Sequence, residues 1–189
     1  MVDTRDSLLR AASQLLEDEG PDALTVRRIA SAAGVSTMGV YSRFGNKDGV
    51  VDALLQDGFE DLLAAMHAVP LTADPLADLQ ASCEAYRAFA LSHPTHYRIM
   101  FGGAVPGFEP SPACVLTGQS GFGALVDRVQ RCLDANLLTG GTAEEISMSL
   151  WATSHGLVSL ELFGNRPQDV LEDDPYARTV SAVIRGFSP

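Results

Sequence analysis

The stretch Thr25–Phe44, TVRRIASAAGVSTMGVYSRF, carries two short helical patterns that meet at Gly34-Val35-Ser36. Thr25 stands at the cap of the first helix and Ser36 at the cap of the second, and hydroxyl side chains favour both positions. Gly34 suits the left-handed conformation in which a chain leaves a helix. The residues expected to face inward recur at helical spacing: Val26, Ile29, Ala30, Ala33, Val40 and Phe44. The stretch therefore predicts a helix-turn-helix.

In a helix-turn-helix, the second helix enters the DNA major groove. The outward residues are here small, hydroxyl-bearing or basic, which suits close approach to phosphates and base edges. We expect DNA contacts from Thr25, Arg27, Arg28, Ser36, Thr37, Met38, Gly39, Tyr41, Ser42, Arg43 and Lys47. The alternative is an αα-hairpin packed inside a helical domain, where such glycines are also common.

The charge distribution favours an anionic partner for this stretch. The whole chain carries a formal net charge of −11, yet Ala23–Lys47 contains no acidic residue and carries +4, which leaves −15 elsewhere. A small basic island on an acidic protein indicates a local anion site.

The rest of the chain also has helical spacing, so the sequence predicts an all-α fold. The 189 residues are 46% hydrophobic and 20% charged, as in ordinary globular proteins. Asn46, Asp74-Pro75 and Thr142 with Glu145 give start signals for later helices. Residues 102–118 contain three prolines and four glycines and are expected to form a loop, with helix resuming at 119–138.

The first ten residues mix Asp and Arg and do not resemble a signal peptide. Three cysteines without metal-type spacing are expected to be reduced thiols. We therefore expect a cytoplasmic protein without a membrane span.

The first fifty residues resemble the DNA-binding signature of the tetracycline-repressor (TetR) family. The resemblance rests on Thr25-Val26-x-x-Ile29-Ala30-x-x-Ala33-Gly34-Val35-Ser36 and on Val40-Tyr41-x-x-Phe44-x-x-Lys47. It implies a three-helix DNA-binding domain, placed here at 1–48, and a helical effector-binding and dimerisation domain at 49–189. Arg43 stands where the family often has His, which keeps a phosphate donor.

A second resemblance lies in Trp151-Ala-Thr-Ser-His155-Gly156 and in the segment from His93 to Gly102, which are similar to a TetR subgroup named for a Trp-His-Gly motif. The candidate effector-binding residues are aromatic or apolar: Tyr86, Phe89, Met100, Phe101, Phe122, Trp151 and His155. His155 is interpreted either as a core histidine or as a ligand contact. Because few basic residues lie between Lys47 and Arg166, we expect an apolar or amphipathic effector rather than an anion.

Residues 146–160 carry no charge on any face of the expected helix, so this helix needs cover on more than one side. Together with the apolar last helix it predicts a homodimer through Leu150, Leu157, Val158, Val180 and Ile184. The alternative is one unusually buried helix in a monomer.

These patterns predict a ligand-responsive transcriptional regulator that binds double-stranded DNA at a palindromic operator, most simply a repressor released by its effector, with the helix 50–66 as the connecting lever. The alternative is a helical module whose basic island engages an acidic protein. An enzyme is not expected: no catalytic or metal-ligand spacing is present, including among Cys83, Cys132 and His155, and no cofactor is implied.

Overall fold

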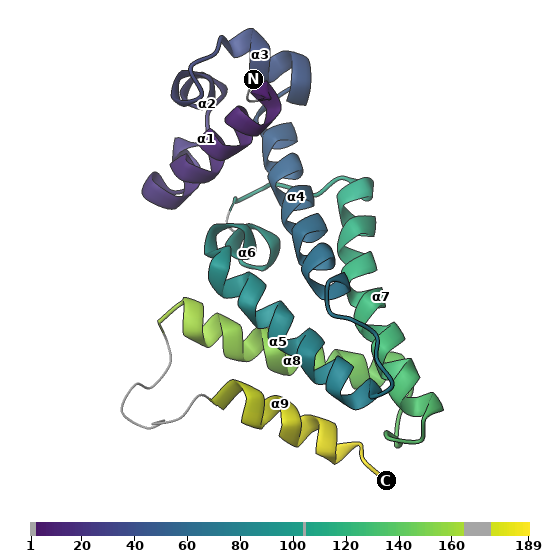
Figure 1. Ribbon diagram of the computed structural model, residues 1–189. Coiled ribbons are helices and arrows are strands. Elements are labelled where there is room, and N and C mark those ends of the chain that lie inside the picture. Colours follow the sequence, from purple (N-terminus) through teal and green to yellow (C-terminus); the bar gives the residue numbers. More distant parts are fainter. Residues whose placement is uncertain (1–2, 104, 165–174) are drawn as a thin grey trace. The chain divides into compact units, whose positions relative to one another are not determined.

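A computed structural model describes residues 3–103, 105–164 and 175–189, and all regular structure within them is helical (Figure 1). The elements in chain order are α1 (Thr4–Glu19), the 3₁₀ turn η1 (Pro21–Ala23), α2 (Val26–Ala32), α3 (Thr37–Phe44), α4 (Lys47–His67), α5 (Pro75–Ser92), α6 (Pro94–Phe101), α7 (Pro112–Asp134), α8 (Ala143–Leu162) and α9 (Pro175–Gly186). Among the described residues, no helix is both long and apolar enough to cross a membrane.

The chain forms two compact units. Unit 1 combines Met1–Glu60 with His93–Gly118, and unit 2 combines Asp61–Ser92 with Gln119–Pro189. Helices α4 and α7 each contribute residues to both units. The functional division at residue 48 remains a prediction.

The core of unit 1 joins α1, α2, α3, α4, α6 and the start of α7. Leu8, Ile29 and Val40 are fully buried in it, one from each of the first three helices. At the surface, Arg5 Nη2 of α1 donates to Asp57 Oδ1 of α4 over 2.7 Å. The N-terminal helices are thereby fixed to α4 by an apolar core and by the Arg5–Asp57 ion pair at its edge.

Unit 2 contains α5, α8 and α9, which pack side by side (Figure 1). Leu79, Ile146 and Leu150 are fully buried, and the Tyr176 hydroxyl donates to the Cys83 carbonyl over 2.7 Å. Helix α8 opens with the expected capping box between Thr142 and Glu145.

The loop expected at 102–118 is too long by seven residues, because α7 begins at Pro112. Ser111 caps this helix: its Oγ accepts from the Cys114 N–H at 3.2 Å, and Asp52 accepts from the Ser111 N–H at 2.7 Å. Proline fits the first turn of a helix, where its missing N–H costs nothing. Gly118 is a packing residue, since a Cβ there would lie 3.1 Å from the Phe59 ring.

Candidate nucleic-acid interface

The turn between α2 and α3 has the hydrogen bonds of a Schellman motif. The Gly34 N–H donates to the Ser31 carbonyl (3.1 Å), and the Val35 N–H donates to the Ala30 carbonyl (2.9 Å). Gly34 has φ +68°, which an L side chain adopts only with strain. The glycine therefore sets the corner from which α3 leaves α2, as the sequence predicts.

The two hydroxyl caps differ. Thr25 Oγ1 accepts from the Arg28 N–H at 3.3 Å and caps α2 as expected. Ser36 occupies the cap position of α3 with extended backbone, but its side chain forms no cap hydrogen bond, so that part of the prediction is wrong. The Ser36 side chain is exposed instead, next to the first residue of α3.

Helix α3 is anchored by one face and exposed on the other. Val40 is fully buried and Phe44 packs against the unit 1 core, whereas Met38 and Tyr41 are 70% and 53% exposed. Of the remaining outward candidates, Gly39 is half-buried and three are exposed: Thr37, Ser42 and Arg43. The outward face predicted from spacing is therefore present as one helix surface.

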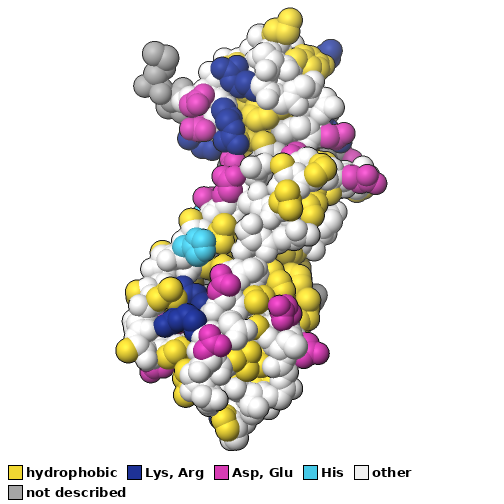
Figure 2. Space-filling view, turned by 90° about the vertical axis from the view of Figure 1, so that its right-hand side faces the viewer, with side chains coloured by type: hydrophobic (Ala, Val, Ile, Leu, Met, Phe, Trp, Pro, Cys, Tyr) yellow, Lys and Arg dark blue, Asp and Glu magenta, His cyan; other side chains and the backbone are white. Residues whose placement is uncertain are grey.

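The basic candidates lie on α2, on α3 and at the start of α4. Arg27, Arg28 and Arg43 are exposed, and Lys47 is the first residue of α4. Arg28 pairs with Glu19 of α1, an acidic residue that lies outside the acid-free window, the stretch Ala23–Lys47. On the face seen in Figure 2, Lys and Arg side chains lie on the part of the surface formed by α1 to α3, beside exposed hydrophobic side chains.

The corner between α3 and α4 fixes Lys47. Gly45 has φ +74°, and Asn46 Oδ1 accepts from the Gly49 N–H at 2.8 Å, which confirms Asn46 as the cap of α4. A Cβ on Gly49 would lie 1.9 Å from the Phe44 carbonyl oxygen, so the two helices meet through backbone. The Lys47 ammonium has a loose contact with Asp48, at 3.9 Å.

Family models match both parts of the chain: residues 8–54 match the bacterial regulatory proteins of the tetR family, and residues 79–186 match a tetracyclin repressor-like C-terminal domain. The chain belongs to the TetR family. It is a DNA-binding transcriptional regulator and not an enzyme, and this decides against the acidic-protein module.

Several known proteins resemble all or part of the chain. The HTH-type transcriptional regulator Rv1816 of Mycobacterium tuberculosis is 27% identical, over 90% of this chain and 87% of its own. The HTH-type transcriptional repressor KstR2 of M. tuberculosis is 41% identical over 78 residues, which are 40% of this chain and 38% of that protein. A solved structure of a Rhodococcus sp. RHA1 protein with unknown function has a TM-score of 0.82 at 28% identity and covers 100% of this chain and 97% of that one. A TetR family regulator, PfmR from Thermus thermophilus, shares the fold with a TM-score of 0.73 at 18% identity, over 96% and 99% of the two chains.

The candidate effector residues of this TetR protein are divided between the units. In unit 2, the ring centroids of Phe122 and Trp151 lie 6.1 Å apart and those of Trp151 and His155 6.0 Å apart, all three partly exposed. Tyr86 and Phe89, also in unit 2, are 5% and 4% exposed and belong to its core. In unit 1, Phe101 packs edge-on against Phe59, with centroids 5.9 Å apart, and Met100 packs on Gly58. Partial burial lowers the pKa of His155.

The residues expected at a dimer interface lie mostly inside unit 2. Leu150, Val158, Val180 and Ile184 are at most 3% exposed in the single chain, because α8 and α9 turn these side chains toward the core of unit 2. Leu157 is half-buried. Helical spacing identified the apolar faces of α8 and α9 but not which of them the chain itself covers.

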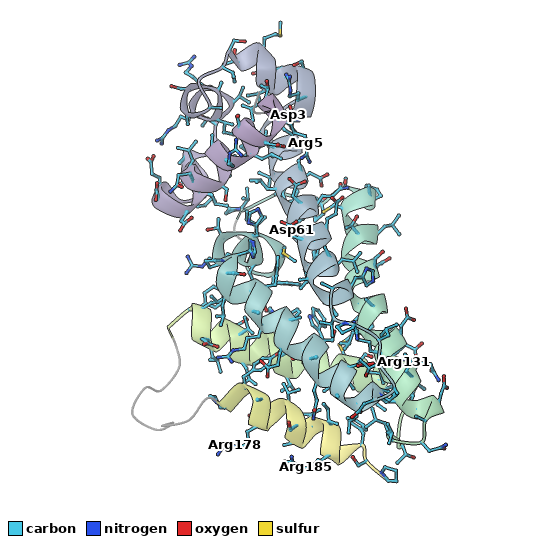
Figure 3. All side chains as sticks on the ribbon, in the orientation of Figure 1. Asp3, Arg5, Asp61, Arg131, Arg178 and Arg185 are labelled. Atoms are coloured by element: carbon cyan, nitrogen blue, oxygen red, sulfur yellow. The ribbon has the colours of Figure 1, made fainter. Side chains whose placement is uncertain are left out.

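The exposed apolar residues of α8 form a different set. Met148 and Leu160 are 49% and 46% exposed, and Ala152 is exposed between them. Phe163, the C-cap directly after α8, is 45% exposed. On α9, Arg178 and Arg185 project from the side that faces away from α5 and α8 (Figure 3). The outer face of α9 is thus partly charged, while that of α8 is largely apolar.

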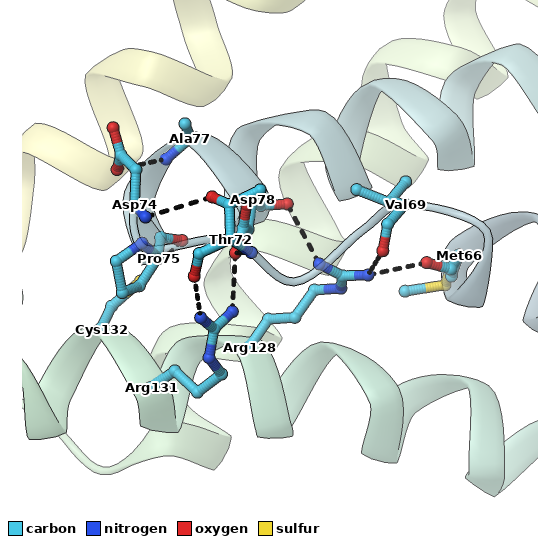
Figure 4. A network of polar contacts seen from close by, with 10 residues as sticks. All are labelled: Met66, Val69, Thr72, Asp74, Pro75, Ala77, Asp78, Arg128, Arg131 and Cys132. Carbon is cyan, nitrogen blue, oxygen red and sulfur yellow. Dashed lines mark hydrogen bonds and ion pairs between the residues drawn. The ribbon is translucent and has the colours of Figure 1, made fainter.

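A polar network in unit 2 was not foreseen from the sequence (Figure 4). Arg128, 5% exposed, donates from Nη2 to the Met66 and Val69 carbonyls at 2.8 and 2.7 Å. Arg131 donates to Asp78 Oδ2 and to the Thr72 carbonyl, both at 2.7 Å. The two arginines of α7 thereby hold the end of α4 and the connection that follows it.

The cysteines have no nucleophilic environment. All three are buried and none forms a disulfide. Burial raises the pKa of Cys83 to about 12 and that of Cys114 to about 11, so both thiols keep their protons at neutral pH.

Proposed function

We propose that this TetR protein is a homodimeric repressor that binds a palindromic operator through residues 1–48 and is released by a small apolar or amphipathic effector bound within 49–189. The observation that carries the proposal is α3: a helix anchored by buried Val40, with Met38, Tyr41 and Arg43 exposed on its other face. Such a helix fits the major groove, and the acid-free window around it suits phosphate contacts.

The proposed mechanism is a two-state equilibrium in which the effector favours the state that binds DNA less well. Helix α4 is the covalent connection, since its first residue is Lys47 and its end is held by Arg128 through the Met66 carbonyl. A change in the direction of α4 in each protomer changes the spacing of the two recognition helices.

The proposed effector site lies at Phe122, Trp151 and His155, the partly exposed ring cluster of unit 2. An uncharged effector is supported by how the basic residues are used. Arg87 pairs with Glu161 at 3.0 Å, and Arg131 pairs with Asp78. Arg128, although buried, is bonded to backbone carbonyls rather than left for a carboxylate ligand.

The proposed dimer interface is the outer face of α8, where Met148, Ala152 and Leu160 are exposed, together with the exposed C-cap Phe163. A two-fold axis would place this face against its own copy, since an isologous interface uses the same patch twice. Leu150, Val158, Val180 and Ile184 then support that face from beneath, and Leu157 lies at its edge.

The test begins with selection of a duplex from a random DNA pool by the purified protein. We expect a palindromic sequence whose affinity exceeds that for unrelated DNA by at least about a thousandfold and falls with salt.

The effector class is then tested with a neutral long-chain alcohol and its matched carboxylate, using the fluorescence of Trp151, the one tryptophan of the chain. The alcohol should change the fluorescence and release the operator at lower concentration than the carboxylate. Equal affinity for all duplexes would contradict operator binding, and stronger release by the carboxylate would contradict the effector class.

A further inference from the structure

The recognition helix α3 presents an apolar side chain where base contacts are made. Met38 is the second residue of α3 and is 70% exposed, and Tyr41, one turn later on the same side, is 53% exposed. The N-terminal residues of a recognition helix are those that reach base edges. We propose that Met38 reads thymine through its 5-methyl group; this rests on the proposed operator binding by α3.

The other base contacts have few side chains on α3 to make them. Adenine is read by the amides of Asn or Gln, and cytosine by the carboxylates of Asp or Glu. The sequence of α3, TMGVYSRF, contains none of these four residue types. Guanine is left to Arg43, which lies in the last turn. Direct readout at the beginning of the helix therefore falls to Thr37 and Met38.

The hydroxyl of Ser42 is already engaged within the helix. Its Oγ donates to the Gly39 carbonyl at 3.3 Å, and this hydrogen bond competes with donation to a base acceptor. At the beginning of α3, the interaction that remains beside the Thr37 hydroxyl is therefore an apolar contact by Met38. The thymine methyl is the apolar group that the major groove offers.

Met38 has no role in the packing of unit 1. The core cluster contains Val40 and, packed against it, Val35 and Phe44, but not Met38. A methionine side chain is unbranched and polarisable, and it adapts its shape to a neighbouring methyl group. Substitution of Met38 should therefore leave the fold intact and change only what α3 contacts.

The experiment replaces thymine by deoxyuridine in the selected operator, one position of each half-site at a time. Deoxyuridine keeps the base pair and the O4 acceptor and lacks only the methyl group. We expect one position at which wild-type protein loses about fourfold in affinity for one half-site and about fifteenfold for both, since one buried methyl group contributes about a fourfold factor. Met38→Ala should bind the thymine and deoxyuridine operators equally, and Met38→Leu should restore the difference.

A matched control is Leu71→Ala, which shortens another apolar side chain, 65% exposed and outside the DNA-binding candidates. This variant should respond to deoxyuridine as the wild type does. If the wild type selects no operator, the proposed function itself fails. If an operator is selected but deoxyuridine costs the wild type and Met38→Ala the same at every position, the methyl contact is refuted, because the effect then arises from groove shape and not from Met38.

Discussion

Arg131 of α7 and Asp78 of α5 form an ion pair in which Nη1 lies 2.7 Å from Oδ2, and the Asp78 side chain is only 4% exposed. The same carboxylate accepts from the Thr72 hydroxyl at 2.7 Å and from the Thr72 N–H at 2.8 Å. Asp78 thus binds Arg131 and Thr72 to the first turn of α5. This fixes the connection between α4 and α5 (Figure 4).

The hydrogen bond from Arg131, followed by those from Thr72, lowers the pKa of Asp78 to about 2, although burial opposes the shift. A carboxyl whose pKa is lower in the folded state stabilises the fold above its unfolded pKa, near 3.9, and this stabilisation is lost as pH falls toward the folded pKa. We predict that wild-type protein is more stable than Asp78→Asn by a constant amount above about pH 5 and that the gap narrows between pH 4 and 2. Urea unfolding of both proteins across this range measures the gap. A gap of the same size at pH 2.5 would contradict the prediction.

Arg128 donates to the Met66 carbonyl, in the last turn of α4, and to the Val69 carbonyl, in the connection that follows. Replacing it by methionine keeps much of the apolar stem and leaves the Met66 and Val69 carbonyls without this donor. We predict a loss of about 3 kcal/mol in the free energy of unfolding, in the range for buried groups that lose a charged hydrogen-bond partner. Arg128→Lys should lose less, since an ammonium can still donate to one carbonyl. A loss below about 0.5 kcal/mol in Arg128→Met, within the range of ordinary surface substitutions, would show that water replaces the arginine.

Local signals in the sequence predicted the helices well. Asn46, Asp74 and Thr142 each accept a backbone N–H at the helix start that they were expected to cap. The beginning of α7 was missed because Pro112 and Gly118 are typical of loops, and the contacts that make them helical, Ser111 with Asp52 and Gly118 with Phe59, join residues distant in sequence.

For the candidate site, too, features set by local sequence could be predicted and features set by distant contacts could not. The exposed face of α3 could be predicted because its spacing is local. The burial of Val180 and Ile184 depends on how α9 packs in unit 2, and the role of Arg128 depends on carbonyls about sixty residues away. No property of a single helix carries that information.

Replacing Gly39 by alanine should increase the stability of the protein and weaken its binding to DNA. A Cβ there would meet Val35 Cγ2 at 3.5 Å, an ordinary contact, so alanine fits. We predict that Gly39→Ala raises the free energy of unfolding by about 0.5–1 kcal/mol, because alanine favours a helix interior over glycine. It should weaken operator binding, because the methyl group lies on the helix that must approach the groove. Gly123→Ala in α7, where a Cβ meets nothing within 4 Å, should be stabilising without affecting operator affinity. Unchanged operator binding in Gly39→Ala would show that DNA does not approach α3 at this position.

The assembly prediction uses Leu160 of α8, 46% exposed in the single chain. Leu160→Glu should fold, because the side chain lies at the surface, and should dissociate the dimer, because the interface would bury a carboxylate without a partner. Light scattering should give twice the 20.1 kDa of one chain for the wild type and about one chain mass for the variant at micromolar concentration. Leu71→Glu, at a site of greater exposure, should remain dimeric. A wild type that scatters as a monomer would remove the basis for a two-fold operator.

Lys47 is the one lysine of the chain and the first residue of α4. Its ammonium lies 3.9 Å from Asp48 Oδ1, and both side chains are well exposed, at 41% and 61%, so this ion pair contributes little to stability. At the N-terminus of α4 the helix dipole is positive, and a phosphate is favoured there together with the ammonium.

Such a phosphate contact positions the protein without reading bases. We predict that Lys47→Ala weakens binding to operator and to unrelated duplexes by the same factor. The slope of log K against log[salt] should become shallower by about 2 per dimer, because two fewer phosphates are neutralised. Asp48→Asn is the matched control: it frees the lysine from its nearest acid and removes a negative charge beside the DNA, so it should bind DNA at least as tightly as the wild type with an unchanged slope. If Lys47→Ala is folded and dimeric but keeps the wild-type salt slope, Lys47 does not contact phosphate, and the cation contacts must be assigned to Arg27, Arg28 and Arg43 alone.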